Sequence, residues 1–364
     1  MFDYEVIVIG GGQGGLTAGY FLSQKNVSYV ILDANKNVGD NWANRYDGLT
    51  LFTPNSLNKL SGFKLPESSA AYLDKDEFAR YLQEYASHHQ LNIQSDSKVI
   101  SLSKSKPGFE VILATGIKLT ARQVILATGA FSQPYIPGFS SNIPKSIKQF
   151  TPEDIRDFKC RNKKVLVVGD GASGRQLAKL FAPDNEVVLA CGRKRYLIPA
   201  KFAGLDTFNI LKRLGILSFG KESWLGKVLR RRDPFPNTGI DFETLKKAGI
   251  CLKPKVTDFN SAIVFADNSG FSPDVIIWAM GYRNAYDFVD IPEAFNKAQL
   301  FINKGQTEVP GLYTISTPWQ VNRASGLIYG VAGDMKRLLP TIIEYQKTSG
   351  LAQSSQTSCD TVCG

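Results

Sequence analysis

Two apolar segments, each followed at once by a cluster of glycines, constrain this chain more than any other feature. They are VIVIGGGQGGLTAGYFL at 6–22 and VLVVGDGASGRQLA at 165–178. Both contain the spacing GxGxxG, formed by Gly10, Gly12 and Gly15 in the first segment and by Gly169, Gly171 and Gly174 in the second. Glycine clusters cost backbone entropy, and close approach of the backbone to a phosphate is one reason for them. Each segment therefore predicts a strand, a glycine loop and a helix.

The residues around the first loop favour a dinucleotide site. A strand-like YEVIVIG leads into the loop, a helix is expected from about Leu16 to Gln24, and a second strand, SYVILD, ends on Asp33. Asp33 lies eighteen residues after Gly15, where a carboxylate would accept hydrogen bonds from the ribose hydroxyls of an adenosine. The predicted binding residues of this unit are Gly10, Gly12, Gln13, Gly14, Gly15 and Asp33.

The second unit differs where its second strand, EVVLACGRKR, ends without an acidic residue. Cys191 and Gly192 occupy the ribose position, and basic residues follow them. Basic side chains suit a 2′-phosphate, so this unit is predicted to bind NADPH, with NADH as a possible substitute. A solvated charge run is the alternative, and Asp170 inside the loop is unfavourable near a pyrophosphate unless its side chain points outward. The predicted binding residues are Gly169, Gly171, Ser173, Gly174, Arg193 and Lys194.

The two units also share the way in which they close. RQVILATGAF at 122–131 closes the first unit, where Thr128 and Gly129 are further predicted cofactor contacts, and PDVIIWAMGYR at 273–283 closes the second. Short alternating segments precede each closing strand and are typical of small antiparallel meanders. The predicted fold class is α/β, with two Rossmann-like dinucleotide-binding domains, one for FAD and one for NADPH, each with a small antiparallel β-meander.

Composition sets the broad class of the protein. A length of 364 residues with 43% hydrophobic content is typical of a globular chain with room for two cores. No apolar run approaches the ~18 residues of a membrane span and no leader segment is found, so we expect a cytoplasmic protein. Five scattered cysteines and two histidines indicate neither a disulfide framework nor a metal site.

The net charge of +10 is concentrated in one segment. Residues 193–232 contain eleven Lys or Arg and two acidic residues, so nine of the ten net charges arise there. These charges are interleaved with large apolar residues at helical spacing rather than gathered in a polar tail. We expect this segment to face solvent, cofactor and substrate and not to bind nucleic acid, with peripheral membrane contact as the less favoured alternative.

Several longer motifs resemble those of the flavin-containing monooxygenase superfamily, in particular its small bacterial CzcO-like members. They are GDNWANRYDGLTLFTP at 39–54, ATGAFSQPYIPG at 127–138, AGLDTFNILKRLGIL with WLGKVLRRRD downstream, and VPGLYTISTPW at 309–319. With the two glycine loops they extend the resemblance over about residues 1–345. The resemblance implies that Trp42 lies near the flavin and that the basic insertion covers the nicotinamide and substrate region.

The resemblance also implies a domain division. The FAD-binding domain takes residues 1–145 and 285–347, and the NADPH-binding domain takes residues 146–284 with the basic helical insertion 193–232. A helix is expected to start near Ser325 and to include Asp334 as a polar residue. The polar segment 348–364, with Cys359 and Cys363, is expected to be a disordered tail.

The function implied by the resemblance is that of an NADPH-reduced flavin monooxygenase acting with O2. Such an enzyme forms a C4a-(hydro)peroxyflavin and oxygenates a small soft nucleophile, such as a sulfide or an amine, or a ketone. Asn55 in FTPNSLNKL is the candidate catalytic hydrogen-bond donor, and a turn asparagine after Pro54 is the alternative.

One departure from the family pattern keeps other functions open. The segment 141–164 lacks the histidine that these monooxygenases usually carry, and Gln149 or Phe150 lies near that place. This favours the alternative of an NADPH oxidase or reductase that passes electrons to a quinone or another acceptor. An accessory flavoprotein of a membrane cation transporter is a third interpretation, and a homodimer is possible.

Overall fold

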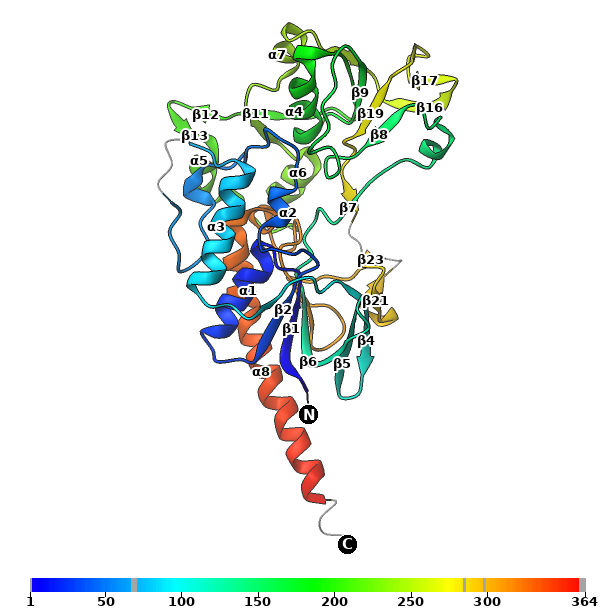
Figure 1. Ribbon diagram of the computed structural model, residues 1–364. Coiled ribbons are helices and arrows are strands. Elements are labelled where there is room, and N and C mark those ends of the chain that lie inside the picture. The colour runs from blue at the N-terminus through cyan, green and yellow to red at the C-terminus, as the bar shows by residue number, and fades with distance from the viewer. Residues whose placement is uncertain (1, 67–70, 284–285, 297–298, 360–364) are drawn as a thin grey trace.

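Two sheets organise the chain, and each is built around one of the glycine loops (Figure 1). The computed structural model describes residues 2–66, 71–283, 286–296 and 299–359, with side chains as far as Thr348. The first sheet has eight strands in the order β21-β4-β5-β6-β1-β2-β3, with β24 also paired to β6. The second has five strands in the order β15-β10-β9-β19-β8. The predicted fold class is confirmed.

The first sheet combines a parallel core with the predicted meander. Its strands are β1 (Tyr4–Ile9), β2 (Tyr29–Leu32), β3 (Ile93–Gln94), β4 (Val99–Ser105), β5 (Gly108–Leu113), β6 (Lys118–Leu126), β21 (Val289–Asp290) and β24 (Leu312–Thr314). Strand β1 lies between β2 and β6 and is parallel to both, whereas β4, β5 and β6 are antiparallel. Strand β24 pairs in parallel with the last residues of β6, so a late segment of the chain completes the first sheet.

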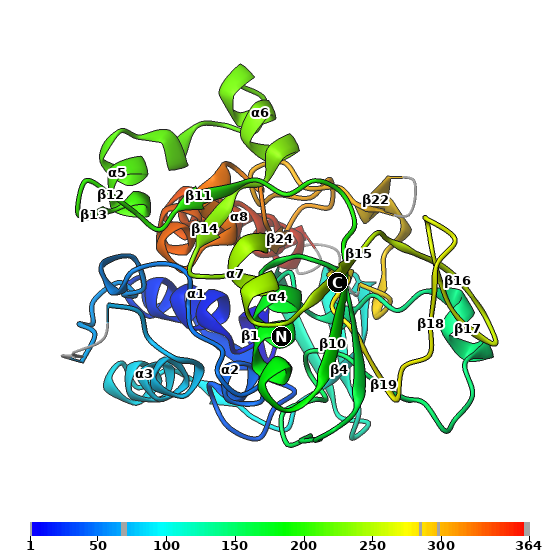
Figure 2. The same cartoon turned by 90° about the horizontal axis from the view of Figure 1, so that it is seen from above.

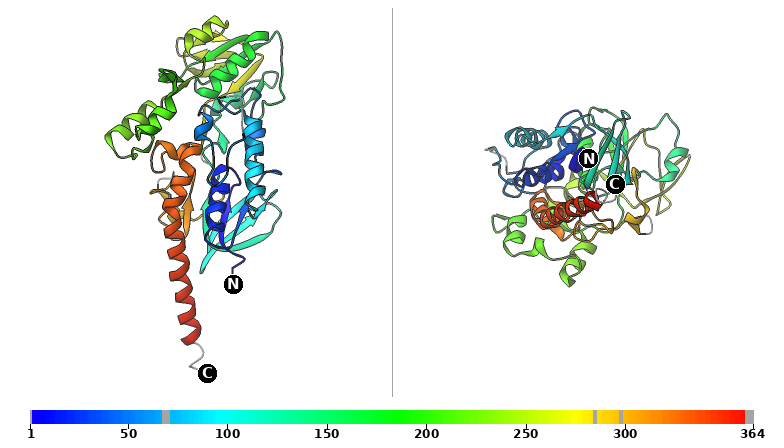
Figure 3. Two further views of the ribbon diagram at one scale, coloured as in Figure 1. Left: turned by 90° about the vertical axis from the view of Figure 1, so that its left-hand side faces the viewer. Right: turned by 90° about the horizontal axis from the view of Figure 1, so that it is seen from below.

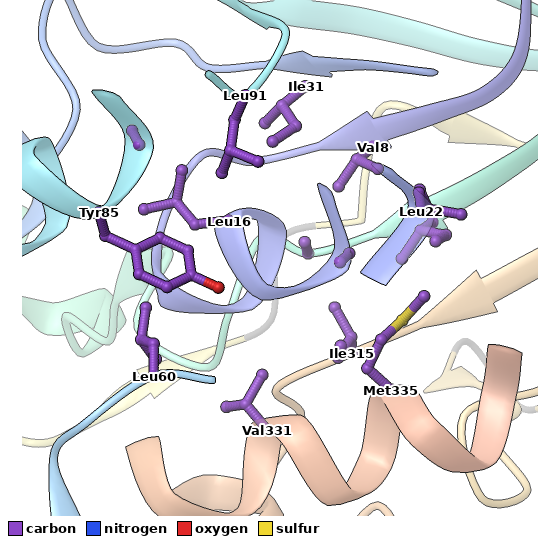
Figure 4. Packing of buried hydrophobic residues seen from close by; sticks show 14 of the residues in the cluster. Val8, Leu16, Leu22, Ile31, Leu60, Tyr85, Leu91, Ile315, Val331 and Met335 are labelled. Carbon is purple, nitrogen blue, oxygen red and sulfur yellow. The ribbon is translucent and has the colours of Figure 1, made fainter. Parts of the chain in front are cut away.

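Both faces of this sheet are covered, which explains the unbroken apolar run of β1. Val6 and Val8 pack on the side of helices α1 (Gln13–Ser23), α3 (Lys75–His88) and α8 (Ile328–Cys359), and Ile7 and Ile9 pack on the other side. Figure 4 shows the helix-covered side, where side chains of α1, α3 and α8 meet those of the strands.

The second sheet is parallel throughout. Its strands are β8 (Lys148–Phe150), β9 (Lys164–Val168), β10 (Glu186–Ala190), β15 (Cys251–Lys253) and β19 (Val275–Trp278). Helix α4 (Ala172–Phe181) follows β9, and α7 (Phe242–Lys247) packs against α4. The second predicted meander is present as the antiparallel strands β16 (Val256–Asn260), β17 (Ala262–Phe265) and β18 (Gly270–Phe271).

The segment between β10 and α7 forms a separate insertion. It contains β11 (Leu197–Pro199), β12 (Lys201–Phe202), β13 (Leu205–Asp206), α5 (Thr207–Arg213), α6 (Trp224–Arg232) and β14 (Phe235–Asn237). Seen from above, α5, α6 and the β12–β13 hairpin lie together along one edge of the molecule, outside the orange part of α8 (Figure 2). A view from the side shows the insertion standing out from the body (Figure 3, left).

Short elements complete the chain. They are α2 (Asp40–Ala43), the pairs β7 (Gln133–Pro134) with β20 (Tyr282–Arg283) and β22 (Phe295–Asn296) with β23 (Gln299–Leu300), and the 3-10 helices η1 (Asn55–Leu57), η2 (Gly138–Asn142), η3 (Ala182–Asp184), η4 (Ile216–Ser218), η5 (Pro292–Ala294) and η6 (Arg323–Gly326). The pairing of β7 with β20 joins the two chain segments that connect the sheets.

Helix α8 differs from the prediction at both ends. It begins at Ile328 rather than near Ser325, because Asn322 accepts a hydrogen bond from the Ala324 amide and caps η6 first. Its backbone continues to Cys359, where a disordered segment was expected, and it projects beyond the body (Figure 1). Residues 360–364, which include Cys363, lie outside the described residues.

Candidate functional site

The first and third glycines of the first loop are required by the fold itself. Gly10 has φ +110°, and a Cβ there would lie 2.6 Å from the carbonyl oxygen of Ala127. A Cβ on Gly15 would overlap the carbonyl oxygen of Gly10, so this glycine lets α1 pack directly on the turn. The contact with Ala127 also places Thr128, the second residue after β6, beside the loop.

The second loop repeats this geometry. Gly169 has φ +106°, and a Cβ there would overlap the carbonyl oxygen of Ala279, just after β19. A Cβ on Gly174 would overlap the carbonyl oxygen of Gly169. The internal duplication predicted from sequence therefore extends to individual contacts, and each closing strand lies against its own loop.

The middle glycine of each loop is not required by the fold. Gly12 and Gly171 have φ −74° and −70°, which any residue adopts. A Cβ on Gly171 would meet nothing within 4 Å, and one on Gly12 would meet only the Nδ2 end of Asn41, at 3.0 Å. Both glycines precede the first turn of a helix that no side chain caps. The space beside each helix start therefore fits a bound pyrophosphate.

Asp33 lies against the first loop. It follows β2, is 6% exposed, and its Oδ1 accepts hydrogen bonds from the backbone and side-chain nitrogens of Asn35 at 2.8 and 2.9 Å. Its Oδ2 is so close to Gly11 that a Cβ on that glycine would overlap it. These contacts fix a carboxylate beside the glycine turn, where an adenosine ribose would be held.

Short contacts bring α2 and a late loop to the start of α1. Trp42 Nε1 donates a hydrogen bond to Gln13 Oε1 at 3.2 Å, and its ring packs edge-on against Phe78. Gly14 leaves room for Ser316, whose Oγ is buried without a hydrogen-bond partner among the described residues. Sequence reasoning missed Ser316 because it lies about 300 residues away along the chain.

Thr128 and Gly129, in the segment after β6, have different surroundings. Thr128 is hydrogen-bonded to the hydroxyl of Tyr286, whose pKa is raised by burial. Gly129 has φ +72° and no atom within 4 Å of the position of a Cβ, so the turn itself requires glycine there.

The carboxylate of Asp170, which sequence reasoning treated as unfavourable for a pyrophosphate unless it points away from the loop, has its partners within the protein. It is buried and faces Arg175, with Oδ2 3.3 Å from the guanidinium, and its Oδ1 accepts a hydrogen bond from the Gly192 amide at 3.0 Å. Arg175 also donates to the carbonyl oxygens of Asp170 and Ile240, both at 2.9 Å. The pair is thus satisfied within the protein and fixes the loop after β10 against the second glycine turn.

Ser173 and Tyr46 link the second loop to the first part of the chain. Ser173, in the first turn of α4, is hydrogen-bonded to the Tyr46 side chain, whose hydroxyl also donates to Gln176 Oε1 at 2.6 Å. Burial raises the pKa of Tyr46 to about 12, so this hydroxyl stays protonated at neutral pH.

Arginines from two parts of the chain surround one carboxylate. Asp233 lies 3.9 Å from Arg193 Nη2, 3.9 Å from Arg195 Nη1 and 4.0 Å from Arg323 Nη2. Burial lowers the pKa of Arg323, whereas Arg193 is mostly exposed and Lys194 lies near the ring of Tyr196. Three guanidinium groups around one carboxylate leave an excess of positive charge that fits a phosphate. Sequence reasoning missed Arg323, which joins this cluster only through the fold.

Asn55 takes part in the local hydrogen bonding of its loop. Its side-chain Oδ1 accepts a hydrogen bond from the Leu73 backbone amide at 2.9 Å, and its backbone amide donates to the Ala71 carbonyl at 3.2 Å. The neighbouring Asn58 is fully buried and bonded twice to Thr53, and so has a structural role. A structural contribution of Asn55 is therefore present, and its catalytic role stays a prediction.

A cavity of about 760 Å³ lies between the first part of the chain and the insertion. It is lined mainly by apolar atoms of Leu51, Ala71 and residues 197–200, with Thr50, Tyr72, Lys201, Asn237 and Thr238 supplying polar groups. The Tyr72 hydroxyl donates to Asp206 Oδ2 at 2.6 Å, and burial together with this carboxylate raises the pKa of Tyr72 to about 12. The volume and the mainly apolar lining of this cavity leave room for a small molecule.

Asp334 is a buried acid on α8 that faces few partners. It is 2% exposed, and its Oδ2 has no hydrogen-bond partner among the residues with described side chains. Arg337 Nη1 lies 3.9 Å from Oδ1. Burial raises the pKa of this carboxyl to about 6, against the opposing effects of Ser325 and Arg337.

The chain is similar to proteins of a known family. The family of pyridine nucleotide-disulphide oxidoreductases matches residues 7–197, more than half of the chain. The chain belongs to this family. A CzcO-like oxidoreductase of Geobacillus kaustophilus, described as uncharacterised, is 36% identical over 345 residues, covering 94% of this chain and 99% of the relative. The predicted oxidoreductase class and the resemblance to CzcO-like proteins are therefore confirmed.

Solved structures show how far the fold of this oxidoreductase is shared. A flavin-containing monooxygenase from Stenotrophomonas maltophilia superposes with a TM-score of 0.78 at 23% identity, over 95% of this chain and 99% of that chain. OTEMO in complex with FAD and NADP gives 0.71 at 18% identity, over 96% and 87% of the two chains. The agreement over nearly the whole chain shows that the arrangement of two sheets is common to these proteins.

Among the described residues, no group of three or more His, Cys, Asp or Glu side chains could hold a metal ion. Among the same residues, no helix combines the length and apolar character needed to span a bilayer.

Proposed function

We propose that this oxidoreductase binds FAD at the first glycine loop and NADPH at the second, and acts with O2 as a flavin monooxygenase on a small molecule. The observation that carries the proposal is the pair of middle glycines, Gly12 and Gly171, which the fold does not require. We use the word cradle for a glycine turn with the uncapped helix start that follows it. Two cradles in one chain indicate two bound dinucleotides. In this assignment residues 1–145 and 285–347 form the FAD-binding domain and residues 146–284 the NADPH-binding domain.

The chain's own residues then have distinct roles. The first turn of α1 would hold the FAD pyrophosphate and Asp33 its ribose, while Trp42 orders the helix start through Gln13. The first turn of α4 would hold the NADPH pyrophosphate, and Arg193 and Lys194 its 2′-phosphate. When bound, the flavin supplies the redox chemistry, accepting hydride from the nicotinamide and reacting with oxygen.

We assign substrate binding to the cavity that residues 50, 51, 71 and 72 form with the insertion. Its mainly apolar lining suits a small sulfide, amine or ketone, and the oxygen of the Tyr72 hydroxyl, whose proton is donated to Asp206, offers an acceptor at its wall. The backbone amide of Asn55 donates to the carbonyl of Ala71, which lines the cavity, and this bond holds Asn55 near it. The side chain of Asn55 is our candidate for a catalytic hydrogen-bond donor.

A second function, an NADPH oxidase or reductase without oxygen transfer, is favoured by one observation. Gln149, near the place of the family histidine, donates to the Ser140 carbonyl at 3.2 Å and accepts from Trp278 Nε1 at 3.0 Å. These bonds give Gln149 a structural role within the second sheet and its surroundings. No imidazole is then available there to influence the reaction with oxygen.

The fate of oxygen separates the two functions. The FAD-loaded protein is mixed with NADPH, oxygen and methyl phenyl sulfide, and the sulfoxide and hydrogen peroxide formed are compared with the NADPH consumed. A monooxygenase gives sulfoxide that carries isotope from labelled oxygen gas, and Tyr72→Ala lowers this yield while the NADPH consumption continues. Peroxide equal to the NADPH consumed, with no oxygenated product from a panel of sulfides, amines and ketones, would establish the oxidase instead.

A further inference from the structure

The insertion carries an exposed surface that the cofactor and substrate sites do not use. We define this insertion surface by two sets of exposed side chains. The apolar set is Phe202, Leu205, Leu214, Phe219 and Trp224, and the basic set is Lys212, Arg213, Lys227, Arg230 and Arg231. The surface lies on the part of the molecule that stands out from the body (Figure 3, left).

The exposure of the apolar set is unusual for this molecule. Among the large apolar side chains with described positions, the four most exposed are Trp224 at 79%, Phe202 at 67%, Leu214 at 65% and Leu205 at 62%. All four lie within the 40 residues of the segment 193–232. Single exposed apolar residues are normal on a protein surface, but such a concentration marks a contact site.

Local structure holds these side chains outward. Ala203 and Gly204, with φ +48° and +79°, form the two-residue turn of the β12–β13 hairpin. Phe202 and Leu205 pair directly across this hairpin, so their side chains lie on the same face at its tip. Trp224 is the first residue of α6, after the capping hydroxyl of Ser223. The apolar groups therefore sit at tips and helix ends and do not line a groove.

Charge limits what can cover this surface. The segment 193–232 carries a net charge of +9, from eleven basic and two acidic residues, which leaves +1 for the rest of the chain. A second copy of the chain would present either the same positive segment or a body with a net charge of only +1, so its net charge does not attract this surface. The partner must be anionic and must also accept protruding aromatic and aliphatic side chains.

We propose that the insertion surface docks on an anionic lipid bilayer. Aromatic and leucine side chains at protruding tips enter the boundary between headgroups and acyl chains, while lysine and arginine side chains pair with anionic headgroups. An acidic protein would need a pocket for each of several separated tips, whereas a bilayer accepts them wherever they lie. The proposal is independent of the flavin reaction, since none of these residues belongs to the assigned cofactor or substrate sites.

Vesicle sedimentation with the full-length protein tests the proposal. The vesicles are of phosphatidylcholine alone, or of phosphatidylcholine with about one-third phosphatidylglycerol. We expect sedimentation with the phosphatidylglycerol vesicles at low salt, release at high salt, and little binding to phosphatidylcholine alone. Soluble protein in every condition would overturn the proposal.

Matched variants test which residues are responsible. The double variant Lys227→Gln with Arg230→Gln should weaken partitioning by roughly 25-fold, about fivefold for each charge. The double variant Phe202→Ser with Trp224→Ser should weaken it by roughly tenfold or more. The controls Lys118→Gln and Ile117→Ser remove an exposed charge and an exposed apolar group that are distant in sequence from the insertion. They should leave partitioning unchanged.

Folding is checked by the melting temperature, which should be the same in all variants because every altered side chain is exposed. Equal losses in the controls would contradict the proposal. So would binding to single-stranded DNA or formation of a dimer through the same residues, if the vesicles themselves are not bound.

Discussion

Replacing the middle glycine of the second loop separates nucleotide binding from folding. In Gly171→Ala the added methyl has φ −70° and meets no protein atom within 4 Å. The folded state is therefore not strained, and loss of glycine flexibility in the unfolded chain should raise stability by about 0.4–1 kcal/mol. The same methyl enters the space assigned to the NADPH pyrophosphate. Overpacking of about 1–3 kcal/mol there corresponds to a roughly 5- to 150-fold weaker affinity for NADPH.

The third glycine of the same loop supplies the control. In Gly174→Ala the methyl overlaps the carbonyl oxygen of Gly169, so the strand, turn and helix must separate and the melting temperature must fall. Thermal melting of the protein without nucleotide is compared with the concentration of NADPH that gives half-maximal flavin reduction. The reasoning is refuted if Gly171→Ala binds NADPH normally, or if it lowers the melting temperature as Gly174→Ala does.

Three further predictions follow from single side chains. Arg193→Ala should weaken the use of NADPH by roughly 10- to 100-fold and change the use of NADH little, measured as the rate of flavin reduction; an equal loss with both would make the cluster around Asp233 a solvated face. Gly12→Val should leave the protein folded but unable to retain FAD, because φ −74° suits valine and its side chain enters the pyrophosphate space; full retention on gel filtration would argue against the first cradle. Asp334, whose pKa burial raises to about 6, binds more protons folded than unfolded between about pH 4 and 6, so its contribution lowers stability as pH rises through that window. Asp334→Asn should therefore raise stability by up to about 3 kcal/mol above pH 6 and by little near pH 4, and a gain equal at both would contradict the burial argument.

The parts of the fold that sequence predicted are those fixed by local spacing. The glycine offsets, the apolar strands that precede them and Asp33 at the end of β2 lie within one βαβ unit, where chain geometry leaves few alternatives. The two meanders were also predicted, because alternation and turn residues are local signals.

The parts that sequence did not predict depend on contacts between distant residues. Arg175, in helix α4, forms an ion pair with Asp170 of the loop before it. The spacing of these two residues in the sequence does not predict that both are buried. Arg323 reaches Asp233 only because β24 returns to the first sheet and places the start of α8 beside the insertion. The same return brings Ser316 to Gly14.

The measurement that tests the central claim most directly is the absorption spectrum of the purified protein during anaerobic titration with nicotinamide nucleotides. The account predicts yellow protein with about one FAD per chain, as the single FAD cradle around Gly12 requires, and bleaching of the flavin band by NADPH at lower concentration than by NADH. Colourless protein that takes up no FAD, or a bound flavin that NADPH does not bleach, would contradict the assignment of the two loops to these two cofactors.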